Sequence, residues 1–311
     1  MPASARVSVM MPTYNYARFL DEAIQSVLNQ TYKDFELVIV DNHSTDSTPE
    51  VVGKYLSDPR VSYHRNETNL GVVGNWNRCL ELANNEYIKF ICADDKFHPQ
   101  ILEKYIPIMD ANPNISLITC DKQLFEDSNE HVKLPFEGLQ PGKKMLFHTL
   151  SRYCWIGEPT SVMFRKRDLH VGKFRPDFSF HVDWDFWIRL LAIGDCYIVP
   201  EVLSYVRFHN AQITKQILSK KVISCFEEYS MCKNVQTGTG YKIDTADTNI
   251  DNIVKKRARY CAKQGLYKMI PRLHKKEYRK VFNRAFGITL REGVFTSALA
   301  EMLSRKKKSY A

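Results

Sequence analysis

Tyr87-Ile88-Lys89-Phe90-Ile91-Cys92-Ala93 is a strand-like run of mostly apolar residues, and it ends in the adjacent pair Asp94-Asp95. Two neighbouring carboxylates at the end of a buried strand repel each other and lose hydration, so a divalent cation is the usual reason to keep them. Aspartate is also common where a strand passes into a turn. The pair alone does not distinguish a metal site from an ordinary turn, so the surrounding sequence is needed to choose between them.

Short apolar runs alternate with amphipathic segments through the first hundred residues. The predicted strands are 7–11, 35–40, 61–64 and 87–93, and the predicted helices are 19–28, 48–56 and 74–83. This alternation predicts right-handed crossovers and an α/β fold with a mostly parallel central sheet flanked by helices. Ligands bind such sheets at the carboxyl ends of the strands, which is where Thr13, Asp41 and Asp94 all fall.

The order of elements becomes looser after about residue 113. Further strands are predicted at 116–120, 161–164 and 196–199, and a helix at 184–193. Beyond Thr214 the pattern is helical, interrupted by a polar stretch at 236–249 that reads as a loop or linker. The chain is therefore predicted to hold an α/β domain over 1–214 and a mainly helical region over 215–311.

Composition and charge narrow the class of protein. A hydrophobic content of 44% with 25% charged residues is typical of a globular protein. No apolar run approaches the roughly 18 residues of a membrane-spanning helix. The amino terminus lacks the order of a signal peptide. The eight cysteines include no C-x-x-C pair, so we expect buried, reduced thiols in a cytosolic protein.

The net charge of +9 is unevenly distributed. Residues 1–214 carry a net charge of −5, whereas residues 215–311 carry +14. Such an asymmetry predicts two parts with different partners.

Several motifs resemble the family-2 glycosyltransferases, and they occur in the family's order. They are Val7-Ser8-Val9-Met10-Met11-Pro12-Thr13-Tyr14-Asn15, the run from Gln30 to Asp41, Ser44-Thr45-Asp46, Asn69-Leu70-Gly71 through Asn77, and Asp94-Asp95 with Pro99. The resemblance covers roughly residues 5 to 214. It implies a GT-A fold, which is Rossmann-like, with a nucleotide-sugar donor, Mn²⁺ or Mg²⁺ as cofactor, and inversion at the anomeric carbon.

The resemblance also implies which residues bind the donor nucleotide. They are Pro12, Thr13, Tyr14, Asn15, Asp41, Asn42, Gly71, Asn77 and Asp94. The family usually has Asp-Asp at 41–42, where the second Asp accepts the imide N–H of uracil, and here Asn42 replaces it. An amide can accept that proton and donate to a ring carbonyl, which favours a UDP- or dTDP-sugar. An Asx turn at the strand end is the alternative.

The same comparison implies a metal site. By analogy Asp95 ligates the cation through the diphosphate, while Asp94 contacts ribose or a metal-bound water. Tyr205-Val206-Arg207-Phe208-His209 looks like the segment that closes the family's catalytic domain, where the histidine helps to hold the metal or the diphosphate. Arg207 pairs either with phosphate or with a helix carboxylate, and the sequence leaves that choice open.

The segment His181-Val182-Asp183-Trp184-Asp185 is similar to the one that supplies the family's general base, although Val182 stands where a Glu is usual. An inverting transfer needs a carboxylate opposite the leaving group to take the proton of the acceptor hydroxyl. Asp183 is the preferred base, and Asp185 is the competitor. Trp184 is a candidate for stacking on a sugar, and Glu158 lies in a run that resembles an acceptor-side loop.

The basic C-terminal region has apolar residues at helical spacing. Val281, Phe282, Ala285 and Phe286 form one stripe, and Val294, Phe295, Ala298, Leu299 and Met302 form another. Basic amphipathic helices lie on anionic lipid, which would suit a polyprenyl-linked glycan acceptor at the inner face of the plasma membrane. The alternatives are a helical appendage packed on the catalytic domain and a homodimer. Nucleic acid is disfavoured because no recognition module surrounds the basic residues.

Taken with the resemblance, these features predict a metal-dependent inverting glycosyltransferase. Its acceptor would be a hydroxyl of a glycan or lipid-linked glycan in bacterial surface polysaccharide or glycoconjugate synthesis. A nucleotidyltransferase would instead need a glycine-rich phosphate loop after the first strand, and residues 12–15 do not supply one. A carbohydrate-binding relic of the fold is the other alternative, and Asn42 with Val182 are the departures that would suit it.

Overall fold

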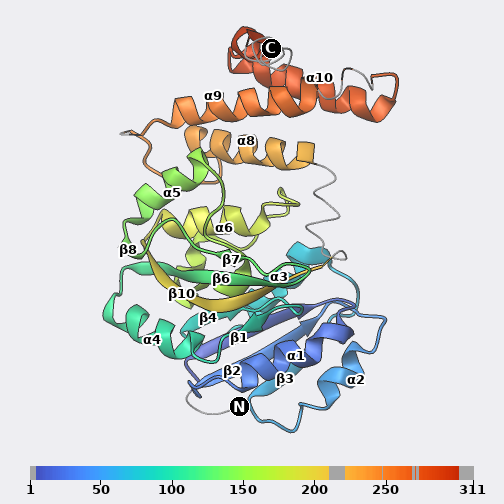
Figure 1. The fold of residues 1–311 in the computed structure, drawn as a ribbon, viewed down its shortest axis with the longest axis vertical. Coiled ribbons are helices and arrows are strands. Elements are labelled where there is room, and N and C mark those ends of the chain that lie inside the picture. The colour runs from blue at the N-terminus through green and yellow to red at the C-terminus, as the bar shows by residue number, and fades with distance from the viewer. Residues whose placement is uncertain (1–4, 210–220, 247, 268–269, 271–272, 301–311) are drawn as a thin grey trace. The chain divides into compact units, whose positions relative to one another are not determined.

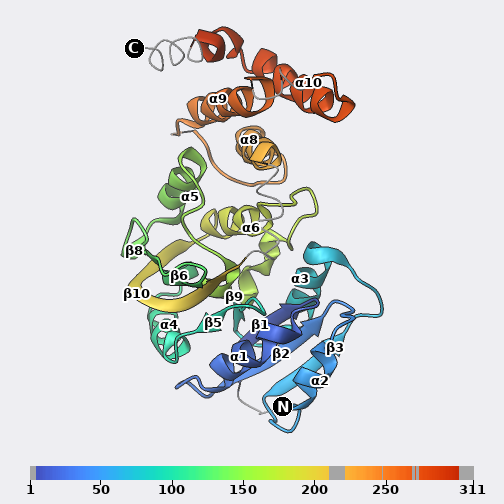
Figure 2. The same ribbon diagram turned by 45° about the vertical axis from the view of Figure 1, so that its right-hand side comes forward.

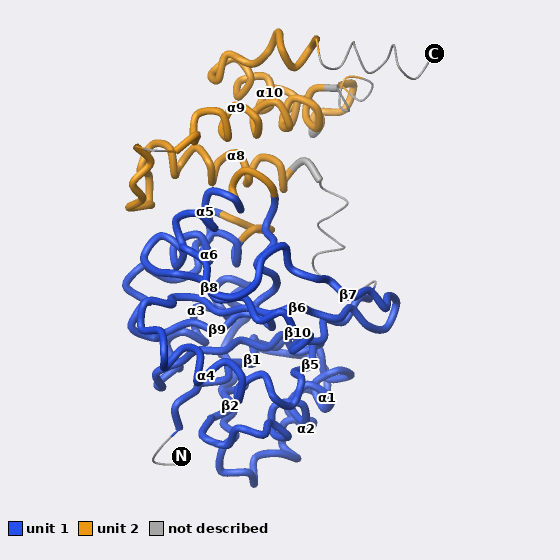
Figure 3. Tube along the Cα trace, turned by 60° about the vertical axis from the view of Figure 1, so that its left-hand side comes forward, with its two compact units in different colours: residues 1–149, 153–177, 182–210 blue, residues 150–152, 178–181, 211–311 orange. Residues whose placement is uncertain are grey.

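The computed structural model describes residues 5–209, 221–246, 248–267, 270 and 273–300. The chain divides into two compact units (Figure 3). The first unit comprises residues 1–149, 153–177 and 182–210, and the second comprises 150–152, 178–181 and 211–311. The boundary predicted at residue 214 falls in the stretch 210–220, outside the described residues.

The first unit is built on one mixed sheet (Figure 1). Its described strands are β1 (Val7–Thr13), β2 (Phe35–Asp41), β3 (Val61–Arg65), β4 (Tyr87–Phe90), β5 (Lys96–Phe97), β6 (Ile115–Glu126), β7 (His131–Val132), β8 (Gly138–Gln140), β9 (Met163–Arg165) and β10 (Asp195–Phe208). The main path runs β3-β2-β1-β4-β9-β6-β10-β5. Strands β1 to β4 pair in parallel, as do β6 and β10, whereas β9 pairs antiparallel with β4 and β6.

Helices cover both faces of this sheet (Figures 1 and 2). They are α1 (Ala17–Leu28), α2 (Thr48–Gly53), α3 (Gly71–Leu82), α4 (Ile101–Ala111), α5 (Gly142–Ser151) and α6 (Val182–Leu191). Apolar residues of α1, α2 and α4 share one core with β1 and β2. On the other face, aromatic rings of α3 and α6 meet those of β4 and β9, as in the contact of Phe164 with Phe186 at 5.3 Å between centroids. Both faces are buried, which explains the nearly continuous apolar runs of the central strands.

The predicted elements are present, but several bounds differ. β1 continues through Pro12 to Thr13, and β4 ends at Phe90, three residues before the predicted end, because the chain turns. α3 begins at Gly71, whose φ of 71° suits glycine, instead of at 74. The segment predicted as a strand from 161 begins as a 3₁₀ turn at Pro159–Ser161. β10 is far longer than the predicted 196–199, and its length carries the chain back to the site.

The second unit is helical. It contains α8 (Lys221–Thr237), α9 (Ile250–Cys261), a π-helical turn at Ala262–Tyr267, α10 (Lys276–Arg291) and a helix over 295–300. The stretch predicted as a loop, 236–249, overlaps the last two residues of α8 and otherwise falls between α8 and α9. Among the residues that the structure describes, no helix combines the length and the apolar character that crossing a membrane requires.

Candidate active site

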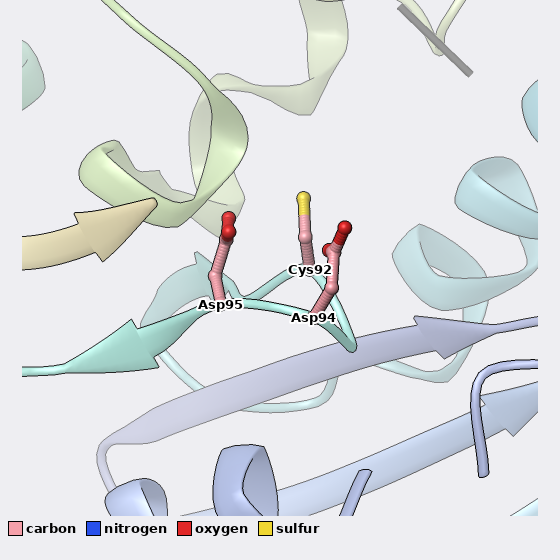
Figure 4. A group of neighbouring side chains, drawn as sticks. All are labelled: Cys92, Asp94 and Asp95. Carbon is pink, nitrogen blue, oxygen red and sulfur yellow. The ribbon is translucent and has the colours of Figure 1, made fainter. Parts of the chain in front are cut away.

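Asp94 and Asp95 lie in a tight turn that follows β4. The Asp95 N–H donates to the carbonyl oxygen of Cys92 at 3.0 Å, which closes the turn. The side chains of Cys92, Asp94 and Asp95 project to the same side, and one ligand atom from each lies within 4.8 Å of the others (Figure 4). Ala93 turns instead into the core. The turn thus presents three potential metal ligands at the carboxyl end of β4.

Both oxygens of Asp95 are oriented by neighbours. The hydroxyl of Thr160 donates to Oδ2 at 2.5 Å, and the backbone N–H of Arg207 donates to Oδ1 at 2.9 Å. Thr160 is itself fixed, because its carbonyl oxygen accepts from the ammonium of the fully buried Lys89. Strands β4 and β10 and the 3₁₀ turn therefore converge on one carboxylate.

His209 follows the last residue of β10 and contacts the turn formed by residues 92–95, the acidic turn. Its Nε2 lies 3.1 Å from Oδ2 of Asp94, and its ring packs on Phe19 of α1 at 4.8 Å between centroids. The structure thus brings Asp94, Asp95 and His209 together, although more than a hundred residues separate the histidine from the pair.

The acidic pair is electrostatically unfavourable as it stands. Burial raises the pKa of Asp94, and burial together with the charge of Asp94 raises the pKa of Asp95. No lysine or arginine in the described part of the chain forms an ion pair with either carboxylate. Desolvation lowers the pKa of the nearby Lys89 to about 7, so its side chain is only partly charged near neutral pH. Carboxylate oxygens with an imidazole are donors that suit Mn²⁺ or Mg²⁺, and a cation would relieve the repulsion.

Arg207 has carboxylate partners within the first unit. Its guanidinium pairs with Glu22 of α1 and with Glu126, and its Nε donates to the carbonyl oxygen of Asp94 at 2.7 Å. It is also sandwiched between Phe19 and Phe125. Of the two roles left open by the sequence, the structure shows the helix carboxylate.

The carboxyl ends of β1 and β2 form the predicted donor side. Thr13 is buried, and its Oγ1 has no hydrogen-bond partner among the residues that the structure describes. Tyr14 is exposed, and Pro12 lies in β1, two residues before it. Asn15, at a φ of 55°, accepts from the Thr45 N–H at 2.7 Å. A buried hydroxyl without a partner is costly, so Thr13 is the residue here that most needs a ligand.

The side chains of Asp41 and Asn77 form hydrogen bonds with other parts of the protein. Asp41 is fully buried, accepting from the Tyr63 hydroxyl at 2.6 Å and from the Ser44 N–H at 2.9 Å. Asn77 exchanges two hydrogen bonds with the backbone of Phe174, each of 2.9 Å. Their predicted contacts with the nucleotide would thus be indirect, through the segments they hold.

Asn42 anchors the loop that precedes α3. Its Oδ1 accepts from the Leu70 N–H at 2.8 Å and from Asn66 at 3.1 Å. Its Nδ2 donates to Asn69 at 2.8 Å and to the carbonyl oxygen of Gly71 at 3.3 Å. All four positions of the amide are occupied, so pairing with a pyrimidine would require the amide to exchange some of these bonds.

Two carboxylates of α6 have different environments. Asp185 is fully buried between Arg175 and Arg189, and accepts from Nη2 of Arg189 at 2.8 Å. Asp183 is half-buried, and its Oδ1 accepts the Trp184 N–H at 2.8 Å. Its charge contributes to raising the pKa of Cys154, after burial, which places it beside the loop that contains Glu158. Asp185 is thus committed to packing, and Asp183 is the better candidate for a base.

Glu158 and Trp184 complete the predicted acceptor side. Glu158 pairs with Lys122 of β6. Burial works to raise the pKa of Glu158, but the Lys122 ammonium outweighs it and lowers that pKa. The side chain of Glu158 remains 43% exposed, so it can still meet a ligand. Trp184 is buried, which favours packing over stacking on a sugar.

The model of the family described as "Glycosyl transferase family 2" matches residues 8–172. The chain belongs to this family. An uncharacterized glycosyltransferase of Methanocaldococcus jannaschii is 33% identical over 236 residues, which is 73% of this chain and 80% of that protein. The resemblance seen in the motifs is thereby confirmed.

Solved structures share the fold. TarS 1–349 of S. aureus in complex with UDP-GlcNAc has a TM-score of 0.70 at 17% identity, covering 92% of this chain and 81% of that one. The mannosyltransferase PcManGT of Pyrobaculum calidifontis, in complex with GDP-Man and Mn²⁺, has a TM-score of 0.55 at 16% identity, covering 94% and 87%. The predicted GT-A fold is confirmed.

Sequence reasoning missed three residues of this glycosyltransferase that lie at the acidic turn. Thr160 and Lys89 support Asp95, and Cys92 stands beside both carboxylates. A lysine inside an otherwise apolar strand run was the one signal available for Lys89. Thr160 ends the run that resembles an acceptor-side loop, but nothing in the sequence indicates its contact with Asp95, which depends on tertiary packing.

Proposed function

We propose that this chain is an inverting, metal-dependent glycosyltransferase that uses a UDP- or dTDP-sugar. The observation that carries the proposal is the buried pair Asp94 and Asp95, met by His209 and lacking a lysine or arginine partner among the described residues. The nucleotide sugars bound by TarS and PcManGT, and the Mn²⁺ bound by PcManGT, support it.

Asp95 and His209 would hold Mn²⁺ or Mg²⁺, which supplies positive charge to a departing nucleoside diphosphate. Asp94 would contact the ribose or a water on the ion. Thr13 would donate its unpartnered hydroxyl to the nucleotide, with Pro12, Tyr14, Asn15 and the Asn42–Gly71 loop around the base.

Asp183 would act as the general base. It would take the proton of an acceptor hydroxyl as that oxygen attacks the anomeric carbon, on the face opposite the diphosphate. The commitment of Asp185 to two arginines supports this assignment. Glu158 is the weaker candidate for binding the acceptor, a glycan or lipid-linked glycan of bacterial surface polysaccharide or glycoconjugate synthesis.

The exposed face of α10 would contact an anionic membrane surface at the inner face of the plasma membrane. Phe286 and Leu290, one turn apart, are exposed, and so are Arg279, Lys280 and Arg291 of the same helix. Apolar side chains among basic ones match a surface of anionic headgroups over acyl chains. We expect binding to vesicles containing phosphatidylglycerol, with each removed cation costing about 1 kcal/mol. Equal binding by Arg279→Glu/Lys280→Glu, or dimerisation through Phe286 seen in sedimentation, would refute it.

The activity is tested by release of nucleoside diphosphate from UDP-, dTDP-, GDP- and CDP-sugars, with Mn²⁺ or with EDTA. Metal-dependent release from one donor, lost in Asp95→Ala, is the expected result. Nucleotide binding is measured in parallel, because strict acceptor dependence would suppress hydrolysis without suppressing binding. Absence of both release and metal-dependent nucleotide binding would leave a carbohydrate-binding relic as the better account.

A further inference from the structure

Cys92 lies among the residues that would hold the metal. Its Sγ and one oxygen each of Asp94 and Asp95 lie within 4.8 Å of one another, and Figure 4 shows all three side chains directed to one side of the turn. The thiol is free and half-buried. A ligand that meets both carboxylates would therefore also meet this sulfur.

Hydrogen bonds fix the position of Cys92 relative to Asp95. The Cys92 N–H donates to Oγ1 of Thr160 at 3.1 Å, and the same hydroxyl donates to Oδ2 of Asp95 at 2.5 Å. The Asp95 N–H closes the turn on the carbonyl oxygen of Cys92 at 3.0 Å. One threonine hydroxyl thus joins both ends of the turn, so sulfur and carboxylate are held together before any ion arrives.

The other described cysteines differ in their surroundings. Cys79, Cys120, Cys196, Cys225, Cys232 and Cys261 are buried. Cys154 is also half-buried, but it lies beside Asp183 and is absent from the group formed with the acidic turn. Cys154 therefore provides a matched control for any experiment on the thiol of Cys92.

We infer that Cys92 is a further protein ligand of the divalent ion, beside Asp95. This inference rests on the proposed function, and it adds a donor that changes which ion the site prefers. Binding would release the thiol proton to solvent and form a bond from sulfur to the metal. Thiolate is a soft donor, whereas Mg²⁺ requires oxygen ligands, so the site favours Mn²⁺, Zn²⁺ or Cd²⁺ over Mg²⁺.

The inference is tested with Cd²⁺ as the probe, alone and in the presence of UDP. Wild-type protein should develop the ultraviolet charge-transfer band of a cadmium–thiolate bond. Cys92→Ser should lose it, and Cys154→Ser should keep it. Calorimetry should show Cd²⁺ affinity reduced by about tenfold or more in Cys92→Ser, because loss of even an indirect partner of a metal costs that much. Mg²⁺ affinity should change far less.

A second measurement uses the wild-type chain and needs no variant to fold. Mn²⁺ should slow alkylation of Cys92 by iodoacetamide, followed by peptide mass spectrometry, and should leave the rate at Cys154 unchanged. Cd²⁺ binding that depends on Asp95 but shows no Cys92-dependent band would overturn the inference and leave the proposed function standing. Cd²⁺ binding that is indifferent to Asp95→Ala, or no binding at all, would overturn both.

Discussion

Buried aspartates at two places in the first unit differ in how their negative charge is compensated. Asp185 lies between the guanidinium groups of Arg175 and Arg189, so its charge is matched within the protein. Asp94 and Asp95 are buried almost as deeply, yet they stand next to each other and the nearest basic side chain bonded to either is His209. Because the protein matches the charge of Asp185 with two arginines, the lack of such a match at Asp94 and Asp95 is a specific feature of the acidic turn. The difference supports the proposal that the acidic turn binds an external cation.

The largest expected effect compares the two carboxylates of α6. Asp183→Asn should lower kcat by about 10²–10⁴-fold, the usual contribution of a general base, while the thermal unfolding curve stays close to that of the wild type. The measurement is the rate of sugar transfer, or of donor hydrolysis, at saturating donor. A variant that retained more than about a tenth of the activity would remove Asp183 from the mechanism.

Removing the charge of Asp185, which two arginines compensate, should instead destabilise the fold. Asp185→Asn leaves the buried guanidinium of Arg189 and the partly exposed one of Arg175 without their carboxylate, and we expect the free energy of unfolding to fall by about 3–5 kcal/mol. Urea denaturation followed by circular dichroism measures this. Arg78→Gln, which breaks an exposed ion pair with Glu81, is the control and should cost less than about 1 kcal/mol. Similar losses in both variants would contradict the distinction drawn here.

Metal affinity should depend on pH. Burial, with the mutual repulsion of the pair, raises the pKa of Asp95, and burial raises that of Asp94, so protons compete with the ion. Affinity should increase as pH rises through these raised values, by up to about tenfold per pH unit for each proton displaced. Calorimetric titration of Mn²⁺ between about pH 5 and about pH 8 would show it. A flat profile would mean that the pair is already ionised without metal.

The smallest effect is a gain in stability. Because the pKa of Asp95 is raised in the folded protein, its contribution to stability is complete at low pH and is lost as pH rises through the raised value. Asp95→Asn should therefore stabilise the metal-free protein by about 1 kcal/mol at neutral pH, and much less in acid. Denaturation in EDTA measures the gain. Added Mn²⁺ should stabilise the wild type and leave the variant unchanged.

The fold was largely predictable because the strands of the first hundred residues are buried on both faces. Their apolar runs stand out from the helical spacing between them, and this alternation predicts right-handed crossovers in a mostly parallel sheet. The later strands were harder to predict. β10 contains Pro200 and Glu201, and its register with β6 shifts around Val199 and Val202, so its apolar pattern breaks although the strand continues.

Only the candidate ligands of the site could be named from the sequence. Asp94, Asp95 and His209 were named from motifs, whereas the side chains that orient them belong to distant segments without a local pattern. Thr160 reaches Asp95 because a 3₁₀ turn packs against β4, and tertiary packing of this kind leaves no periodicity in the sequence. The sequence likewise gave no sign that the side chains of Asp41 and Asn42 form hydrogen bonds within the protein, because those bonds depend on how the surrounding segments fold.

The hydrogen-bonded asparagines around Asn42 should make the loop before α3 less sensitive to pH and salt than the acidic turn. Asn42, Asn66 and Asn75 are joined by amide hydrogen bonds, and Asn75 is anchored on the carbonyl oxygen of Val40. Amides neither gain nor lose protons over the physiological range, and uncharged contacts are little screened by salt. The loop before α3 should therefore keep its shape through acidification or a change in ionic strength that alters the acidic turn. A drop in pH would then release the ion while the nucleotide side of the site stays assembled.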